Sequence, residues 1–278
     1  TQQHSNTGPR VAAYDCIVLG TGGVGSAALY HLASRGLRVL GLERFGPGHD
    51  RGSSHGQTRI IRQAYFEHAD YVPLVLRAYE LWHELEQRRG EQPFVQAGLS
   101  EVGPAEGSVA PGVKAAGADQ IMSRWPGFRV PHEMSGVFER EAGYLHVERC
   151  VVAHLEAARE MGAELQTGIG IVGWQVQGDT VTVKSDGESF SAARLILAPG
   201  AWAPQLLSGL RLPLEVRRKP LFWYECPEQY HVDSGFPGYL FEMPEGIFYG
   251  FPQIDERGIK IAEHTAGDIV TDPLLVDR

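Results

Sequence analysis

The sequence has little of what marks several common classes of protein. It holds three cysteines, Cys16, Cys150 and Cys226, whose spacing fits neither a disulfide framework nor a zinc site. No apolar run approaches the roughly 20 residues that cross a bilayer, and residues 1–10 lack the apolar core of a signal peptide. Basic residues are outnumbered, with a formal net charge of −9, which argues against a nucleic acid held through its phosphates. We therefore expect a cytoplasmic protein with neither a membrane nor a nucleic-acid partner.

Glycine is plentiful, and one glycine-rich stretch stands between two apolar runs. Cys16–Leu19 leads into the Gly20–Gly25 segment, a helical pattern follows, and Val39–Leu42 ends in Glu43. This order of strand, glycine turn, helix, strand and acid is typical of the βαβ unit that binds an adenine dinucleotide. The residues predicted to contact the dinucleotide here are Gly20, Gly22, Gly23, Val24, Gly25 and Glu43.

Each part of this stretch has a physical reason. Gly20 permits the tight turn, Gly22 lets the backbone approach a pyrophosphate, and Gly25 lets the helix pack close to the strand. The N–H groups and the positive dipole end of the helix favour the diphosphate, while Glu43 would accept hydrogen bonds from the adenosine ribose. A plain structural turn with a solvated Glu43 is the alternative, and the motif by itself does not separate NAD from FAD.

Helical and strand patterns alternate along the rest of the chain. Between Tyr71 and Leu85, apolar residues recur at helical spacing, and these apolar residues are expected in the core. Glu164–Ala192 resembles a small antiparallel meander, and Arg194–Ala198 is expected to be a strand buried on both faces, as in a parallel sheet. Antiparallel strands are expected from Leu214 onward. The helices predicted by this pattern are Val24–Arg35, Asp70–Arg89 and Glu148–Met161.

The loop after Glu43 delivers two arginines, Arg59 and Arg62. If a helix starts near Thr58, these arginines are three residues apart and project from one face. Two guanidinium groups near a cofactor would suit a carboxylate substrate, because arginine offers a bidentate fork. Two surface arginines paired with acids are the alternative.

A cation and an imidazole share one face of a predicted strand near the end of the chain. In Ile259–His264, the side chains of Lys260, Ala262 and His264 point to the same side. A positive charge there would stabilise an anion that develops nearby. A solvated strand face with an ordinary lysine is the alternative.

The chain resembles the flavin-dependent sarcosine oxidase and N-methyltryptophan oxidase family from Tyr14 to His264. The matching segments, in chain order, are GTGGVGSAALYHLASRG, GSSHGQTRIIRQAY, YVPLVLRAYELW, RWPGFRVP, LILAPGAW, RRKPLFWYE, FYGFP and GIKIAEHT.

The resemblance implies FAD as the cofactor and an α/β fold in which a Rossmann-like FAD-binding domain, of the glutathione-reductase type, is interleaved with an antiparallel β-rich substrate domain. The FAD-binding domain is expected to comprise residues 12–92 and 148–213, and the substrate domain residues 93–147 and 214–278. Further contacts to the cofactor are expected from Arg44, Ser53, Ser54, Thr58 and Gly200.

The resemblance also implies the roles of individual side chains. Arg62 matches the arginine that holds the substrate carboxylate, and Tyr249 and His264 match residues of the substrate pocket. Lys260 matches the lysine that promotes reduction of dioxygen, while Arg59 and His55 match residues beside the flavin ring. The expected partners are a small amino-acid substrate and dioxygen, and the expected state is a monomer or a weak oligomer.

The reaction implied by the resemblance is oxidation of a secondary amine in an amino acid. Hydride leaves the carbon next to nitrogen for flavin N5, and water splits the resulting imine, releasing formaldehyde when the lost group is N-methyl. Dioxygen reoxidises the flavin and yields hydrogen peroxide. An NAD-dependent dehydrogenase and a non-catalytic dinucleotide-binding fragment or subunit are the alternatives.

The chain departs from the family pattern at two loop positions and at its end. Ser54 stands where a second histidine is frequent, and Gln57 where an acid is common. Family members continue beyond the position of Arg278, and that part is expected to carry the cysteine that tethers FAD and a lysine that shares the substrate carboxylate. We therefore expect this chain to be a fragment of a complete enzyme.

Overall fold

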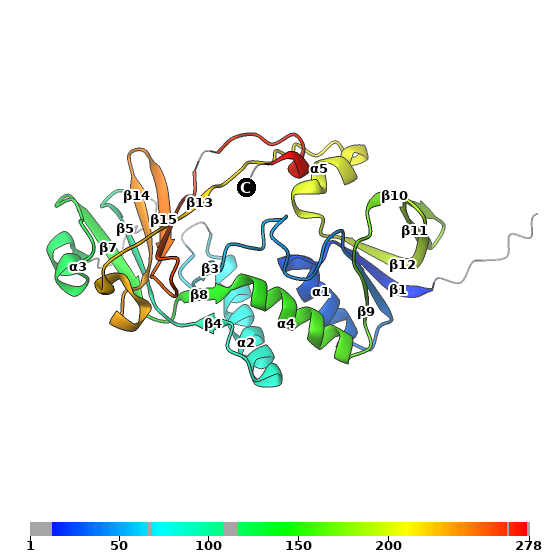
Figure 1. The fold of residues 1–278 in the computed structure, drawn as a ribbon, viewed down its shortest axis with the longest axis horizontal. Coiled ribbons are helices and arrows are strands. Elements are labelled where there is room, and N and C mark those ends of the chain that lie inside the picture. Colours follow the sequence, from blue (N-terminus) through cyan, green and yellow to red (C-terminus); the bar gives the residue numbers. More distant parts are fainter. Residues whose placement is uncertain (1–12, 66–67, 108–115, 266, 277–278) are drawn as a thin grey trace, which may run out of the picture. The chain divides into compact units, whose positions relative to one another are not determined.

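The computed structural model describes residues 13–65, 68–107, 116–265 and 267–276, and its chain packs into two compact units (Figure 1). Unit 1 comprises the described parts of Thr1–His55, Val147–Glu215 and Asp272–Arg278. Unit 2 comprises those of Gly56–His146 and Val216–Thr271. The expected boundaries after residues 147 and 213 lie within two residues of unit boundaries, whereas the one after residue 92 falls inside unit 2. The assignment of all four expected segments to an FAD-binding and a substrate domain stays a prediction.

Unit 1 is built on a six-stranded sheet with the order β10-β11-β12-β1-β2-β9. Strands β12, β1, β2 and β9 run parallel, and β10, β11 and β12 form an antiparallel meander. The meander was expected to include Glu164, but that residue begins β9, which pairs with β2 instead. The strands are β1 (Tyr14–Leu19), β2 (Val39–Leu42), β9 (Glu164–Gln166), β10 (Ile171–Gln177), β11 (Thr180–Ser185) and β12 (Ser189–Leu197).

Helices α1 (Gly23–Ala33) and α4 (Val147–Glu160) lie side by side on one face of this sheet (Figure 1). Leu29 of α1 and Leu155 of α4 pack against Val18 of β1 on that face. Ile17 and Leu19 of β1 point to the other face, where they meet side chains of β11 and β12. A central parallel strand is buried on both faces in this way, which explains its unbroken apolar run.

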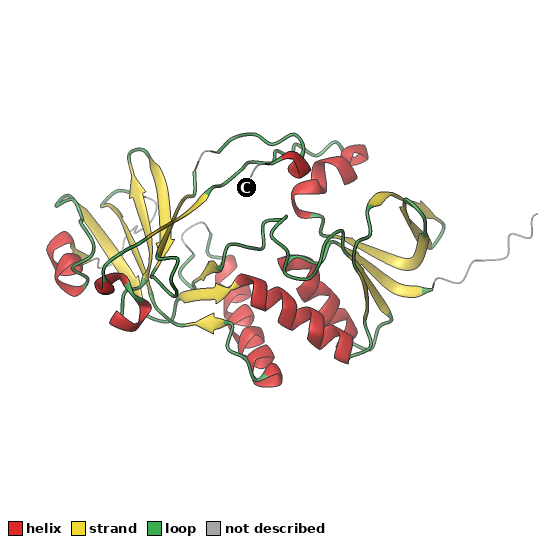
Figure 2. Ribbon diagram, viewed as in Figure 1, coloured by secondary structure: helices red, strands yellow, loops and turns green. Residues whose placement is uncertain are grey.

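Three short helical turns follow β12, and a fourth lies near the chain's end (Figure 2). All of the predicted strand Arg194–Ala198 except its last residue belongs to β12, which runs parallel to β1, so the expected parallel pairing is confirmed. This segment is only partly buried, however: Leu195 and Leu197 are half-buried and Arg194 is exposed. The turns are η1 (Gly200–Trp202), α5 (Ala203–Leu206), η2 (Ser208–Leu210) and η5 (Pro273–Leu275).

Unit 2 contains a seven-stranded sheet with the order β13-β16-β15-β14-β5-β7-β6 and a three-stranded sheet with the order β3-β8-β4. Every pairing is antiparallel except that of β14 with β5. The strands are β3 (Thr58–Ile61), β4 (Phe94–Val95), β5 (Leu99–Pro104), β6 (Ala116–Gly117), β7 (Met134–Glu139), β8 (Gly143–His146), β13 (Leu221–Tyr224), β14 (Gly238–Met243), β15 (Gly246–Phe251) and β16 (Ile259–Glu263). The helices are α2 (Tyr71–Arg89), α3 (Ala118–Arg124), η3 (Glu228–Tyr230) and η4 (Val232–Ser234).

The two faces of the seven-stranded sheet differ in character. One face carries Val102, Phe241 and Tyr239, which pack in an apolar core with α3, Trp125 and Phe236. Cross-strand partners share a face of a sheet, and the register Glu101–Leu240–Tyr249–Ala262 therefore defines the opposite face. We call this opposite face the site face. It also carries Lys260, two residues before Ala262.

Helix α2 corrects one expectation about the core. The stripe from Tyr71 to Leu85 was expected to be buried, but Tyr71 and Leu74 are exposed. The rest of the stripe is covered: Leu85 is buried, and Val75, Tyr79 and Trp82 pack with the small apolar patch of the three-stranded sheet, which is made of Ile61, Phe94 and Leu145.

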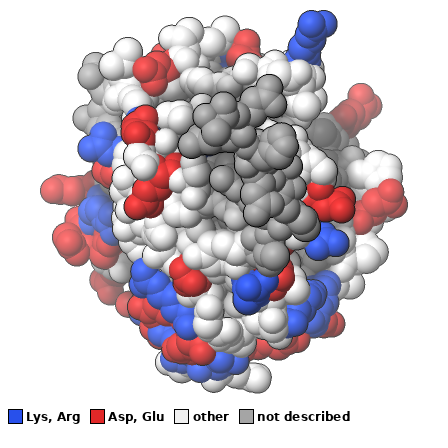
Figure 3. Space-filling view, turned by 90° about the vertical axis from the view of Figure 1, so that its right-hand side faces the viewer, with Lys and Arg blue, Asp and Glu red and all other residues white. Residues whose placement is uncertain are grey.

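Within the described ranges, no helix is both long and apolar enough to cross a membrane. On the face drawn in Figure 3, acidic and basic side chains lie among one another rather than in a field of one sign.

Candidate functional site

The glycine turn between β1 and α1 has a geometry that only glycine fits at two positions. Gly20 has a φ of +83°, and a Cβ there would lie 2.4 Å from the carbonyl oxygen of Ala198. A Cβ at Gly25 would lie 1.8 Å from the carbonyl oxygen of Gly20. By contrast, a Cβ at Gly22 would meet only Ser54, at 3.4 Å. The turn thus keeps its backbone tight against β12 and leaves the helix start uncrowded, which is the cradle that a pyrophosphate needs.

Glu43, at the end of β2, is buried and joined to this turn. Its Oε2 accepts from the Thr21 amide at 2.7 Å and from the Thr21 hydroxyl at 3.2 Å. Its Oε1 accepts from the Phe45 amide at 3.1 Å and lies 3.4 Å from His49 Nε2. A carboxylate has about four lone-pair positions, and these four contacts use them. A ribose hydroxyl would therefore have to replace one of the two longer contacts, which come from the Thr21 hydroxyl and from His49.

The loop after β2 contacts the start of α1 through Ser54. The Gly23 amide donates to Ser54 Oγ at 2.9 Å, so this hydroxyl takes one of the helix's first N–H groups. Ser53 and Arg44 are exposed, and the Arg44 guanidinium lies 6.0 Å from the Phe45 ring. His55 is half-buried at the end of this loop.

Two further predicted cofactor contacts lie at exposed backbone positions of unit 1. Val24, in the first turn of α1, is 76% exposed. Gly200 is exposed at the start of η1 with a φ of +55°. The residues of unit 1 fit a dinucleotide, since the glycine cradle, the helix start and a carboxylate at the end of β2 come together. The described residues contain no group of three or more potential metal ligands.

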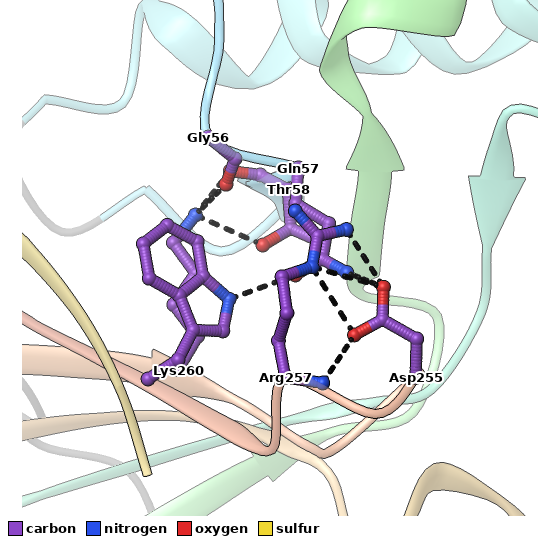
Figure 4. A network of polar contacts seen from close by, with 7 residues as sticks. Gly56, Gln57, Thr58, Asp255, Arg257 and Lys260 are labelled. Atoms are coloured by element: carbon purple, nitrogen blue, oxygen red, sulfur yellow. Dashed lines mark hydrogen bonds and ion pairs between the residues drawn. The ribbon is translucent and has the colours of Figure 1, made fainter.

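Lys260 forms the centre of a polar network in unit 2 (Figure 4). The side chain is 1% exposed, and its Nζ donates to the Gly56 carbonyl at 2.5 Å and to the Thr58 carbonyl and hydroxyl at 3.0 and 3.1 Å. Nζ also lies 4.7 Å from the centre of the Phe251 ring. The solvated lysine that the strand pattern left open is therefore excluded: the ammonium group is held inside, on the site face.

Gln57 fixes the loop that receives Lys260, and sequence reasoning did not include it among the site residues. It is buried with a φ of +76°, in the left-handed region that a side chain rarely adopts. Its Nε2 donates to Asp255 Oδ2 at 2.5 Å, and its Oε1 accepts from the Trp223 indole at 3.0 Å. Asp255 in turn binds Arg257 at 2.7 Å (Figure 4). Only the departure from an acid at position 57 hinted at this network.

Tyr249 and His264 lie close together, with ring centres 6.3 Å apart. Burial raises the pKa of Tyr249, and the positive charge of Arg59 acts against that rise. His264 is exposed just after β16, whereas Lys260 on the same face is buried. The site face thus runs from a closed end at Lys260 to an open end at His264.

Arg62 is paired with an acid, as in the alternative drawn from the sequence, but the pair is buried rather than on the surface. The helix considered near Thr58 does not form: Thr58–Ile61 is strand β3, so a shared helical face for Arg59 and Arg62 is wrong. Arg62 instead pairs with the carboxylate of Glu101 on β5, and both side chains are buried. The Arg62 guanidinium also lies 4.8 Å from the Tyr65 ring. The available signal was an acid between Leu99 and Val102, two apolar residues of a short strand.

The fold and the glycine cradle indicate a dinucleotide-binding protein, and comparison with known proteins gives its family. The model of the FAD dependent oxidoreductase family matches residues 15–274. The chain belongs to this family, which confirms FAD as the cofactor and the α/β fold class.

Two curated relatives confirm the resemblance drawn from the sequence. Monomeric sarcosine oxidase of Streptomyces avermitilis is 40% identical over 95% of this chain and 73% of its own length. N-methyl-L-tryptophan oxidase of Escherichia coli is 36% identical over 92% of this chain and 72% of its own length.

Solved structures share the fold at lower identity. NikD, an unusual amino acid oxidase, has a TM-score of 0.79 at 23% identity and covers 96% of this chain and 73% of its own. Glycine oxidase from Geobacillus kaustophilus has a TM-score of 0.72 at 20% identity, with 92% and 72% covered.

Proposed function

We propose that this protein oxidises the secondary amine of an N-methyl amino acid such as sarcosine, with FAD as the electron acceptor and dioxygen as the final oxidant. The observation that carries the proposal is the site face of unit 2. There the buried Lys260, the Tyr249–His264 pair and Arg59 gather, in a chain 40% identical to a monomeric sarcosine oxidase.

The adenine dinucleotide end of FAD would be held by unit 1. The N–H groups at the start of α1 would face the pyrophosphate, and Glu43 would accept from the ribose hydroxyls. Arg44, Ser53, Ser54, Thr58 and Gly200 are the further contacts in this proposal. When bound, FAD supplies the two-electron acceptor that the amine oxidation needs and returns the electrons to dioxygen as hydrogen peroxide.

Lys260 would supply a fixed positive charge for the reduction of dioxygen. Its ammonium group is held by three oxygen acceptors, so it does not have to reorient when negative charge develops. Placed charges of this kind are worth most in a site that excludes water, and this side chain is 1% exposed. Arg59 and His55 would lie near the flavin ring.

The substrate would lie against the site face. Tyr249 and His264 would line its pocket, and Arg62 would meet the carboxyl group of the amino acid. The amine nitrogen must be unprotonated, because its lone pair is needed when hydride leaves the neighbouring carbon, and the positive charges of Lys260 and Arg59 would favour the neutral amine. We do not favour the alternative of an NAD-dependent dehydrogenase, because the chain belongs to an FAD-dependent family.

We further propose that the enzyme works in the cytoplasm as a monomer or a weak oligomer. Cys16, Cys150 and Cys226 all lie in the described residues and form no disulfide there, which suits a reducing compartment, and the relative with 40% identity is described as monomeric.

The test is product formation by the full chain incubated with FAD. With sarcosine and air, we expect hydrogen peroxide and formaldehyde in equal amounts, and none without FAD. Glycine, which has no N-methyl group, is the matched control for formaldehyde. Absence of both products with sarcosine and with every other secondary amino acid tried would leave a non-catalytic dinucleotide-binding protein as the better account.

A further inference from the structure

The side-chain amide of Gln57 is held in one orientation by its two neighbours. The Trp223 indole, which can only donate, donates to Gln57 Oε1 at 3.0 Å. On the other side, Gln57 Nε2 donates to Asp255 Oδ2 at 2.5 Å, and an ionised carboxylate can only accept (Figure 4). Because a donor lies on one side and an acceptor on the other, the amide cannot turn over without losing both hydrogen bonds.

Gln57 lies between the two residues that bind the ammonium group of Lys260. Lys260 Nζ donates to the carbonyl oxygens of Gly56 and Thr58. Gly56 and Gln57 both have a positive φ, +87° and +76°. For Gln57, which is not a glycine, this conformation persists only where the surroundings hold it. The hydrogen bonds of the Gln57 amide therefore help to hold the turn that presents both carbonyl groups to Lys260.

Asp255 accepts hydrogen bonds on both of its oxygens. Oδ2 accepts from Gln57 and, at 2.7 Å, from Arg257 Nη2, while Oδ1 accepts from the Arg257 backbone amide at 3.0 Å. The side-chain hydrogen bond from Arg257 also lowers the pKa of Asp255, which keeps the carboxylate ionised. An asparagine here would turn an N–H group toward one of these donors. A carboxylate is therefore the side chain that satisfies both neighbours.

We propose that Asp255 is a positioning residue for Lys260: through Gln57 it holds the two carbonyl oxygens that fix the ammonium group. Asp255 lies in the connection between β15 and β16, 198 positions from Gln57 in the sequence, so this contact fastens the turn before β3 to the strand pair that carries Lys260. The consequence for oxygen reduction rests on the function proposed above for Lys260. The consequence for the place of the ammonium group does not.

The first experiment measures how well Lys260 is shielded. The full chain loaded with FAD is treated briefly with acetic anhydride, and mass spectrometry compares acetylation of Lys260 with that of Lys184, which is exposed. In the unmodified protein Lys260 should react far more slowly. In Asp255→Asn the ratio of Lys260 to Lys184 acetylation should rise about tenfold, as expected when the closed state loses about 1.4 kcal/mol. An unchanged ratio overturns the proposal.

The matched control is Glu256→Gln, which makes the same chemical change at the next residue, an exposed position. This variant should keep the acetylation ratio of the unmodified protein. A rise equal to that of Asp255→Asn would overturn the proposal, because loss of any negative charge from this connection would then suffice.

An exchange of the two groups tests the path through Gln57. Gln57→Glu by itself sets two carboxylates against each other and should raise the ratio. In the double variant of Gln57→Glu and Asp255→Asn, the carboxylate at position 57 accepts from the Trp223 indole and from the amide at position 255. The oxygen of that amide accepts from Arg257, so every donor is paired again.

The ratio in the double variant should therefore return to within about threefold of the unmodified protein, whereas independent effects would combine. A ratio that shows both single effects combined overturns the proposal. If a single variant does not fold, the double variant decides: slow acetylation of Lys260 supports the proposal, and acetylation as fast as that of Lys184 overturns it.

Stopped-flow kinetics test the consequence for the reaction. In Asp255→Asn, reoxidation of the reduced flavin by dioxygen should slow about tenfold, while anaerobic reduction by sarcosine should change by less than about threefold. Equal slowing of both steps overturns a role through Lys260. If the unmodified protein oxidises no secondary amine, the proposed function is wrong, and the acetylation ratios alone decide whether Asp255 positions Lys260.

Discussion

His154, on α4, makes the stability of unit 1 depend on pH in a direction that can be calculated. The side chain is 7% exposed, and its ring lies 5.6 Å from that of Tyr30 and 6.3 Å from that of His31, both on α1. Burial lowers the pKa of His154 from 6.5 to about 4, with a further contribution from the charge of His31 and an opposing one from a backbone hydrogen bond to Cys150. Two changes test this dependence: a fall in pH, which protonates the imidazole, and a substitution that removes it.

The sign follows from proton binding. Between pH 6.5 and about 4 the unfolded chain binds a proton at His154 that the folded chain refuses. The contribution of the neutral His154 imidazole to the free energy of unfolding is therefore fully present above pH 6.5 and is lost as the pH falls through this window. The two pKa values limit the loss to about 3 kcal/mol, and between pH 7.5 and pH 5 it amounts to about 2 kcal/mol. The packing of α1 on α4 supports the glycine cradle, so the loss weakens the scaffold of the FAD site.

Urea denaturation at several pH values measures this loss. In His154→Gln the free energy of unfolding is expected to be lower at pH 7.5, because packing is disturbed, but its decline toward pH 5 should be smaller by about 2 kcal/mol. The matched control is His132→Gln, at a side chain that is 85% exposed, which should keep the decline of the unmodified protein. Equal declines in the unmodified protein and His154→Gln would refute the reasoning.

Three further predictions concern the cofactor site and the network around Lys260. Gly25→Ala places a Cβ against the Gly20 carbonyl and should weaken FAD binding by about tenfold or more in a fluorescence titration; unchanged affinity contradicts the cradle. Lys260→Met should slow flavin reoxidation by about 10²–10³-fold in stopped-flow experiments with oxygen, while anaerobic reduction by the amine changes far less; equal effects on both steps contradict the role in oxygen reduction. Gln57→Ala leaves the Trp223 indole without its acceptor and should lower the free energy of unfolding by about 1–3 kcal/mol. Gln57→Gly should cost less than Gln57→Ala, because glycine tolerates the positive φ; the reverse order contradicts the strain at this position.

Much of unit 1 could be predicted because its signals are local. The apolar runs Cys16–Leu19 and Val39–Leu42 and the glycines between them determine β1, α1 and β2 with little help from the rest of the chain. The strand β9 could not be predicted to pair with β2, since such pairing depends on residues more than a hundred positions apart in sequence. The exposed side of α2 was missed because helical periodicity shows which residues share a face, not whether another element covers that face.

The candidate site was predictable where a residue type and a strand period sufficed. The shared face of Lys260 and His264 follows from the alternation of side chains in a strand. The partners of Lys260 did not, because Gly56 and Thr58 contribute backbone carbonyls that no sequence pattern marks. Arg62 was expected to face a substrate, and its pairing with Glu101 required knowledge of how the residue that follows β3 approaches a strand of another sheet. Contacts between distant strands, rather than local propensity, decide these details.

The most direct test of the central claim is the visible spectrum of the full chain, purified after incubation with FAD and then mixed with sarcosine without oxygen. The account predicts flavin absorbance that the amine bleaches and that air restores, with release of hydrogen peroxide. A protein that retains no flavin, or a flavin that no secondary amine reduces, would contradict it.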